Sequence, residues 1–208
     1  MSALLLHDTP AERDERASFG MWIFLATEVL FFGVLLLAYA YGRMAWPRGF
    51  ALASRHTDVL LGTLNTALLL TSSAAAAWAV VCAERQGLHA RAARLLDATV
   101  VLGLAFLVVK GIEYRAELQE GLFPDARFRL ADTPGAALFF MLYWVTTALH
   151  ALHLGIGIVL IEVLAAGLRR RRAWAGARQV DIAALYWHFV DIVWIFLYPL
   201  LYLVERHR

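Results

Sequence analysis

The chain has 208 residues, of which 61% are hydrophobic and 17% are charged, and its mean hydropathy is positive. Its apolar residues arrive in long blocks instead of at the spacing of a soluble helix or strand, which is typical of an integral membrane protein. The single Cys82 excludes an internal disulfide framework and a paired-cysteine metal site. The formal net charge of +2 is small and the Arg residues fall between the apolar blocks, so we exclude nucleic-acid binding.

The apolar blocks predict an all-α fold, a polytopic bundle of five transmembrane helices. Residues 1–17 are polar and mixed in charge, and the apolar run after them is too long for the core of a signal peptide, so it is expected to remain as the first span. We expect a single transmembrane domain over residues 18–205 and a short tail at 206–208. Its helices are predicted at about residues 19–41, 58–83, 95–115, 135–168 and 182–204.

The connections between the spans are predicted to be irregular. Pro47 lies in a loop after the first span, and residues 116–134 form the longest connection, which is interrupted by prolines. Lys110 lies near the end of the third span, where its long side chain is expected to reach the membrane surface. Small residues on the second span, beginning with Gly62, predict close contact with another helix.

The Arg residues outside the spans predict the orientation. Because there are five spans, the two termini lie on opposite sides of the membrane. Ten Arg residues fall on the side of the N-terminus and eight on the other, and the bias is concentrated in Arg169–Arg172 within a short connection. We therefore expect a cytoplasmic N-terminus and a periplasmic C-terminus.

Three polar residues in the first and fourth spans are candidate functional residues. Glu28 lies mid-span, either as a carboxyl group that exchanges protons or contacts lipid, or as a neutral acid hydrogen-bonded to a neighbouring helix. His150 and His153 share one side of the fourth span and could ligate a metal together. A zinc site needs three or four ligands, however, and Glu162 is several turns away, so we favour hydrogen bonds between helices and expect no metal here.

Lys110 and Glu113 are spaced as helical neighbours near the end of the third span, and Tyr114 follows them. An intrahelical ion pair near the membrane surface is the favoured interpretation, and contact with a lipid headgroup is the alternative.

The last span carries two costly polar residues. His188 and Asp191 form either a His–Asp hydrogen-bonded pair or two separate contacts with other helices, and no second haem ligand accompanies His188. Trp187, Asp191 and Trp194 lie on one stripe of this helix. A carboxylate on that stripe needs a protein partner, because facing lipid would cost it several kcal/mol.

Five stretches share their residues and their order with a known membrane family. The last, YWHFVDIVWIFLYPLLY at residues 186–202, closely resembles the last-helix signature of subunit III of the haem–copper oxidases. WIFLATEVLFFG surrounds Glu28, and TTALHALHLGIG contains the two histidines. The others are LNTALLLTSS at residues 64–73 and KGIEY at residues 110–114. The matches extend from residue 22 to residue 203, and the chain resembles the five-helix bacterial form of this subunit.

The resemblance implies a non-redox subunit with no active site of its own and no bound haem, copper or other metal. It implies binding to catalytic subunit I and to subunit II of a respiratory terminal oxidase, which hold the haem and copper, in the plasma membrane of a bacterium. Such a subunit supports assembly, stability and proton uptake while oxygen is reduced to water, and it binds phospholipid. Glu28 matches the family's carbodiimide-reactive membrane carboxylate, which favours a buried acid of functional importance.

Two alternatives remain at this point. Pro199 interrupts the last span, where it removes a backbone hydrogen bond and is expected to bend the final turns. Five-helix relatives also serve as accessory proteins of nitric oxide reductase, and the segment around Pro199 is compatible with that branch. The second alternative is an autonomous proton channel or transporter that uses Glu28, Asp191 and Lys110 as a relay. The ordered motifs favour a subunit over a channel, and the oxidase is the leading hypothesis.

Overall fold

The computed structural model describes residues 10–85 and 87–204, and within them the regular structure consists of six α-helices and no strand. The helices are α1 (Pro10–Ala45), α2 (Pro47–Ser54), α3 (Val59–Glu84), α4 (His89–Gln119), α5 (Ala136–Arg169) and α6 (Ala177–Tyr202). All of these except the short α2 are long and apolar enough to cross a membrane. The predicted all-α fold with five spans is therefore confirmed, and the chain is a multi-pass membrane protein.

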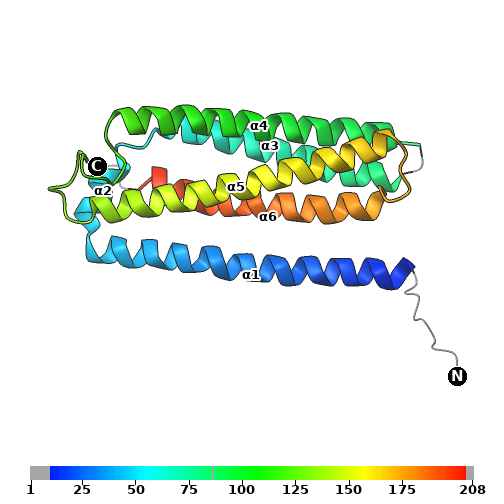
Figure 1. Cartoon of the computed structure of the whole chain (residues 1–208), viewed down its shortest axis with the longest axis horizontal. Helices are drawn as coiled ribbons and strands as arrows, with labels where there is room; N and C mark the ends of the chain where they lie inside the picture. The colour runs from blue at the N-terminus through cyan, green and yellow to red at the C-terminus, as the bar shows by residue number, and fades with distance from the viewer. Residues whose placement is uncertain (1–9, 86, 205–208) are drawn as a thin grey trace, which may run out of the picture.

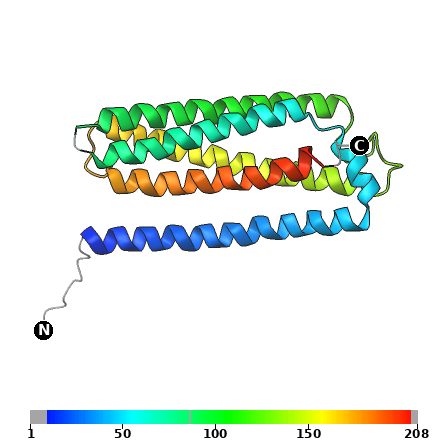
Figure 2. The same ribbon diagram turned by 180° about the vertical axis from the view of Figure 1, so that it is seen from behind.

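Four of the long helices form a bundle and the fifth lies beside it. α3 packs against α4 and α6, and α5 packs against the same two helices. α1 runs along one side of this bundle, next to α5 and α6 (Figure 1). The view from behind shows α2 at the end of the bundle where α1 and α6 end (Figure 2). α1 begins and α6 ends at opposite ends of the bundle, as five spans require.

α3 and α5 match the predicted bounds to within one residue, whereas α1, α4 and the start of α6 extend past them. α1 begins at Pro10 instead of residue 19, so the described part of the predicted polar segment is helical, and residues 1–9 lie outside the described residues. α4 covers residues 89–119 instead of 95–115, and α6 begins at residue 177 instead of 182. The physical reason is that Arg, Glu and Ala are good helix formers, so backbone hydrogen bonding continues where the apolar surface ends.

The loop predicted after the first span is instead the helix α2. Pro47 occupies its first helical position, where the missing N–H costs nothing. Phe50 and Ala53 are fully buried, which explains why this segment is ordered against the bundle. Gly49 lies so close to the start of α5 that an added Cβ would come within 2.0 Å of the carbonyl oxygen of Pro134.

The end of α6 is capped by side chains from earlier segments. Pro199 does not end the helix, which continues to Tyr202. The hydroxyl of Tyr39 in α1 donates to the carbonyl oxygen of Leu200. Thr57 donates to the carbonyl oxygen of Leu201 over 3.3 Å, and Ser54 donates to that of Val204 over 3.2 Å. Carbonyl groups at the helix end that have no intrahelical partner therefore find donors in α1 and in the segment between α1 and α3.

Glycines allow α6 to approach its neighbours closely. An added Cβ at Gly62 of α3 would lie 2.8 Å from the ring of Tyr202. At Gly103 of α4 it would lie 2.7 Å from the ring of Trp187, and at Gly157 of α5 it would lie 3.1 Å from the same ring. The small residues predicted to mark helix contacts on the second span thus do so, and equivalent positions exist on α4 and α5.

Gly103→Ala is expected to destabilise the folded chain by roughly 1–3 kcal/mol, because the new methyl group overpacks the contact with Trp187. The midpoint of thermal unfolding in mild detergent measures this. Gly111→Ala in the same helix is the matched control, since an added Cβ there meets no atom within 4 Å, and its midpoint should not fall. Equal loss of stability in the two variants would contradict the packing argument.

Candidate functional site

A buried ionic cluster lies on the inner side of α4. Lys110, Glu113 and Glu117 follow one another at helical spacing and have exposed fractions of only 2%, 1% and 4%. The prediction that the side chain of Lys110 reaches the membrane surface was therefore wrong. Its ammonium group lies among the rings of aromatic residues from α4, α5 and α6, which are Tyr114, Tyr143, Trp194 and Tyr202.

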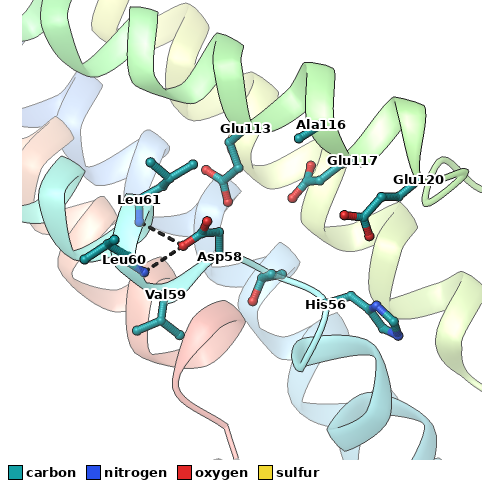
Figure 3. Close-up of a pocket in the computed structure, with 10 residues that line it drawn as sticks. His56, Asp58, Val59, Leu60, Leu61, Glu113, Ala116, Glu117 and Glu120 are labelled. Atoms are coloured by element: carbon teal, nitrogen blue, oxygen red, sulfur yellow. Dashed lines mark hydrogen bonds between the residues drawn. The ribbon is translucent and has the colours of Figure 1, made fainter.

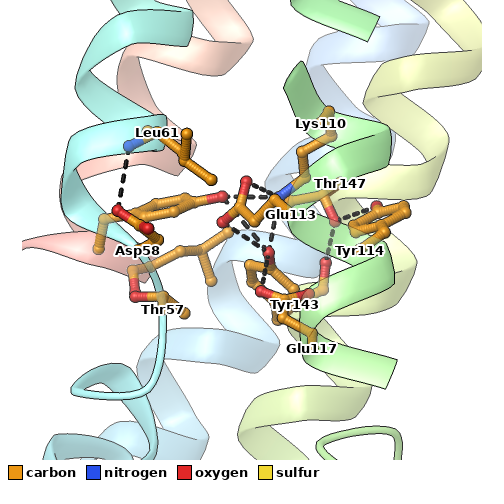
Figure 4. A network of polar contacts seen from close by, with 12 residues as sticks. Thr57, Asp58, Leu61, Lys110, Glu113, Tyr114, Glu117, Tyr143 and Thr147 are labelled. Carbon is orange, nitrogen blue, oxygen red and sulfur yellow. Dashed lines mark hydrogen bonds and ion pairs between the residues drawn. The ribbon is translucent and has the colours of Figure 1, made fainter. Parts of the chain in front are cut away.

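The ammonium group of Lys110 uses each of its three donors inside the bundle (Figure 4). It donates to Oε2 of Glu113 over 3.0 Å, which is the intrahelical ion pair that the spacing favoured. It also donates over 2.6 Å to the hydroxyl oxygens of Tyr143 in α5 and Tyr202 in α6. One buried cation thus connects three transmembrane helices.

Tyr143 links the cluster to a second carboxylate. Its hydroxyl group donates to Oε1 of Glu117 over 2.5 Å, and Oε1 of Glu113 lies 3.1 Å away. Tyr114, the third residue predicted in this motif, forms a hydroxyl contact of 2.6 Å with Thr147 in α5. The two tyrosines and the two acids therefore extend the polar contact between α4 and α5.

The cluster has more acidic groups than cations. Lys110 can balance the charge of Glu113, but Glu117 is equally buried, and an uncompensated charge in this environment is costly. The Oε2 atom of Glu117 has no hydrogen-bond partner among the described residues. It lies beside a cavity of about 420 Å³ between α4 and the start of α3, shown in Figure 3. The polar residues lining this cavity are His56, Thr57, Asp58, Glu113, Glu117 and Glu120.

Glu28 and His153 form a second polar contact, between α1 and α5. Nε2 of His153 lies 3.0 Å from Oε2 of Glu28, and both side chains are mostly but not fully buried. Nδ1 of His153 lies 2.8 Å from the carbonyl oxygen of Leu149 and must carry a proton to donate to it. Oε2 of Glu28 has no hydrogen-bond partner among the described residues, so the two groups lie within ion-pair distance without a hydrogen bond between them.

A third group of polar residues joins α3 to α6. Nδ1 of His188 lies 2.8 Å from the hydroxyl oxygen of Ser73. The carboxylate of Asp191 is buried, makes no hydrogen bond among the described residues, and has the same Ser73 as its polar neighbour. The two residues therefore contact α3 and do not form a His–Asp pair.

The indoles on the same helix bind α3 directly. Nε1 of Trp187 donates to Ser72 and Nε1 of Trp194 donates to Thr66, each over 3.0 Å. The predicted stripe of Trp187, Asp191 and Trp194 thus lies at the contact between the two helices, where hydrogen bonds offset the cost of burying the two indole N–H groups in a membrane.

His150 has different neighbours from His153. It is buried between the rings of Phe106 and Trp194, whose centroids lie 5.5 and 5.1 Å from that of its imidazole. Neither ring nitrogen has a hydrogen-bond partner among the described residues. Across residues 10–85 and 87–204, no three His, Cys, Asp or Glu side chains are grouped so that they could hold a metal ion.

Sequence reasoning missed three residues of this site, Glu117, Tyr143 and Tyr202. Glu117 was assigned to an irregular connection because the third span was ended at residue 115. Its spacing of four residues from Glu113 would have placed both on one side of a longer helix. Tyr143 and Tyr202 lie on the fourth and last spans, and their contacts with Lys110 depend on how α4 packs against α5 and α6.

Comparison with known proteins agrees with the motifs. The family model for cytochrome c oxidase subunit III matches residues 6–205. Cytochrome c oxidase subunit 3 of Gadus morhua is 33% identical, and the match covers 94% of this chain and 72% of that protein. Cytochrome c oxidase subunit 3 of Corynebacterium diphtheriae is 28% identical, with coverage of 93% and 90%. Heme-copper oxidase subunit I+III of Aeropyrum pernix is 32% identical over 94% of this chain, which spans 23% of that longer protein.

Lys110→Met is expected to destabilise the chain by about 3–5 kcal/mol, because it leaves buried acids without their cation. The double variant Lys110→Met/Glu113→Gln should lose less stability than the single variant, since one of those acids is then removed. Thermal unfolding in detergent measures both. A double variant that is at least as unstable as Lys110→Met would show that the charge pair is not the source of the loss.

Proposed function

Because the chain belongs to the cytochrome c oxidase subunit III family, we propose that it is the non-redox subunit III of a bacterial haem–copper terminal oxidase. In this role it supports the assembly, stability and proton uptake of the complex that reduces oxygen to water. Haem and copper belong to the partner subunits I and II, and this chain supplies no catalytic residue. The proposed location is the bacterial plasma membrane, with the Arg-rich connections on the cytoplasmic side.

The observation that carries the proposal is the continuous family match over residues 6–205. The name of the Aeropyrum pernix relative joins subunits I and III, which supports subunit I as the partner of this chain. α1 turns many large apolar side chains outward, and only 11% of the residues in its most apolar segment are buried within the chain. This exposed apolar surface suits contact with such a partner or with lipid.

The contact between Glu28 and His153 supports the role in proton uptake. The two groups lie 3.0 Å apart, and the side chain of Glu28 has an exposed fraction of 17%. A carboxyl group that is partly accessible and has an imidazole within reach can exchange a proton with it after a small rearrangement. The carboxyl group of Glu28 thereby acts as a local proton store at the side of the complex and not as a reacting group.

The tagged chain, purified in mild detergent from its native membrane, is expected to bring down a haem-containing subunit and to consume oxygen with an electron donor. Visible spectroscopy and an oxygen electrode measure this. Recovery of a haem-free oligomer that conducts protons in liposomes would overturn the subunit assignment. Consumption of nitric oxide in place of oxygen would assign the chain to the nitric oxide reductase branch.

Glu28→Gln is expected to leave the haem bands and the yield of the complex unchanged, while the number of turnovers before inactivation falls several-fold. The reason is that Gln cannot exchange a proton with His153 although it fills the same space. Glu84→Gln, at the exposed end of α3, is the matched control. A lost haem band in an otherwise assembled Glu28→Gln complex would contradict the non-redox assignment, and unchanged turnover would contradict the proton role.

A further inference from the structure

An acidic cavity lies at the end of the bundle where α3 begins and α4 ends. Figure 3 shows the carboxyl groups of Glu113, Glu117 and Glu120 along one side of α4, facing the segment that contains His56 and Asp58. Four carboxylates thus line a space of about 420 Å³, which is large enough to hold another group.

Only two of these four carboxylates have a cation as partner. Glu113 pairs with Lys110 over 3.0 Å, and Glu120 lies 3.7 Å from Arg129. The remaining two make no ion pair with any basic side chain in the part of the chain that the structure describes. The cavity is therefore left with two negative charges that the described residues do not balance.

Glu117 gives independent evidence that a donor is missing from the cavity. Its exposed fraction is 4%, and its Oε1 atom accepts from Tyr143, but Oε2 has no hydrogen-bond partner among residues 10–85 and 87–204. Lys110 cannot supply the donor, because its three N–H groups already donate elsewhere. A buried carboxylate oxygen without a donor is costly, so the cavity calls for a donor, preferably a cation, from beyond these residues.

The chain that follows α6 starts at the wall of this cavity. Thr57 lines the cavity and its hydroxyl donates to the carbonyl oxygen of Leu201, while the hydroxyl of Ser54 donates to that of Val204. Val204 is buried, so the chain is held against this end of the bundle up to its last described residue. The sequence continues, outside the described residues, with Glu205, Arg206, His207 and Arg208. Arg206 follows Val204 by two residues, which an extended backbone covers in about 7 Å.

We propose that residues 205–208 fold over the acidic cavity, where the guanidinium groups of Arg206 and Arg208 supply the cations that it lacks. A guanidinium group suits this place because it is always charged, is weakly hydrated and presents several donors to carboxylates. A basic side chain of another subunit offers the same chemistry. A segment joined to the cavity wall, however, has an effective concentration in the millimolar range without any second chain.

The docked segment connects the end of α6 to α3 and α4 through ion pairs, at the end of the bundle where the carbonyl groups of α6 are already capped. The proposal depends on the membrane fold and not on the role in an oxidase, so either proposal can fail without the other.

A double-mutant cycle tests the contact in the full chain, purified in mild detergent and followed by thermal unfolding. Arg206→Gln/Arg208→Gln should lower the midpoint by about 2–4 °C, the shift expected in a chain of this size for the net loss of one hydrogen bond. In the background Asp58→Asn/Glu117→Gln the same change should have no effect, because the unbalanced carboxylates are gone. The background itself should fold, since Asn still caps α3 and Gln still accepts from Tyr143.

Arg48→Gln/Arg127→Gln is the matched control for the cycle. It removes two exposed charges at the same end of the bundle and should leave the midpoint unchanged in both backgrounds. An unchanged midpoint in Arg206→Gln/Arg208→Gln, or an equal fall with and without the carboxylates, would overturn the proposal and assign the missing donor to another subunit or to a proton on the carboxyl group.

Cross-linking tests where residues 205–208 lie. The single cysteine is first removed as Cys82→Ser, so that only engineered thiols react. His56→Cys/His207→Cys, with His56 on the cavity wall, should then be linked within one chain by a short bismaleimide, as detected by mass spectrometry of the peptides. The yield should fall several-fold when Asp58→Asn/Glu117→Gln is added.

The control for the cross-link is Asp132→Cys/His207→Cys. Asp132 is exposed and lines a different cavity at the same end of the bundle, so this pair should be linked several-fold less. Equal yields for the two pairs, or a yield from His56→Cys/His207→Cys that does not respond to the loss of the carboxylates, would contradict docking in the acidic cavity.

Discussion

The structure depends on the absence of water inside a bilayer, because a polar group buried there is costly unless it finds a partner within the protein. Lys110 shows the consequence most clearly. Its ammonium group could have reached the membrane surface, yet it lies inside the bundle with Glu113, Tyr143 and Tyr202 as acceptors. Since those acceptors come from α4, α5 and α6, the relative positions of three helices are specified by the hydrogen-bonding needs of a single cation.

α1 is attached to the bundle by a different and smaller set of contacts. Glu28 meets His153 of α5, Tyr39 donates to the end of α6, and Phe32 packs on the imidazole of His153. The rest of the helix presents apolar side chains to the surroundings. The chain is thus a tightly connected four-helix bundle with a fifth helix attached through a few specific points, and the Glu28–His153 contact belongs to the attached part.

Hydropathy alone predicted the number and type of the long helices, and the order of the motifs identified the family. Helix ends were not predictable in the same way, because the helical backbone continues into polar residues, and this hid Glu117 in a supposed loop. The partners of Lys110 and His188 on other helices were not predictable either. Spacing shows which residues share a helix face, but it does not show which other helix that face meets, and the partners here lie between 33 and 115 residues away in the chain.

The hydrogen bonds between α3 and α6 have a direction that matters while the chain is being made. The hydroxyl of Thr66 donates to the carbonyl oxygen of Gly62, and that of Ser72 donates to the carbonyl oxygen of Leu69, so both donors are satisfied within α3 before any other helix is present. The indoles of Trp187 and Trp194 then add donors to oxygens that still have a free lone pair. Since chains emerge from the ribosome N-terminus first, the hydroxyl donors of Thr66 and Ser72 can remain satisfied in the membrane until the last helix arrives to complete the bundle.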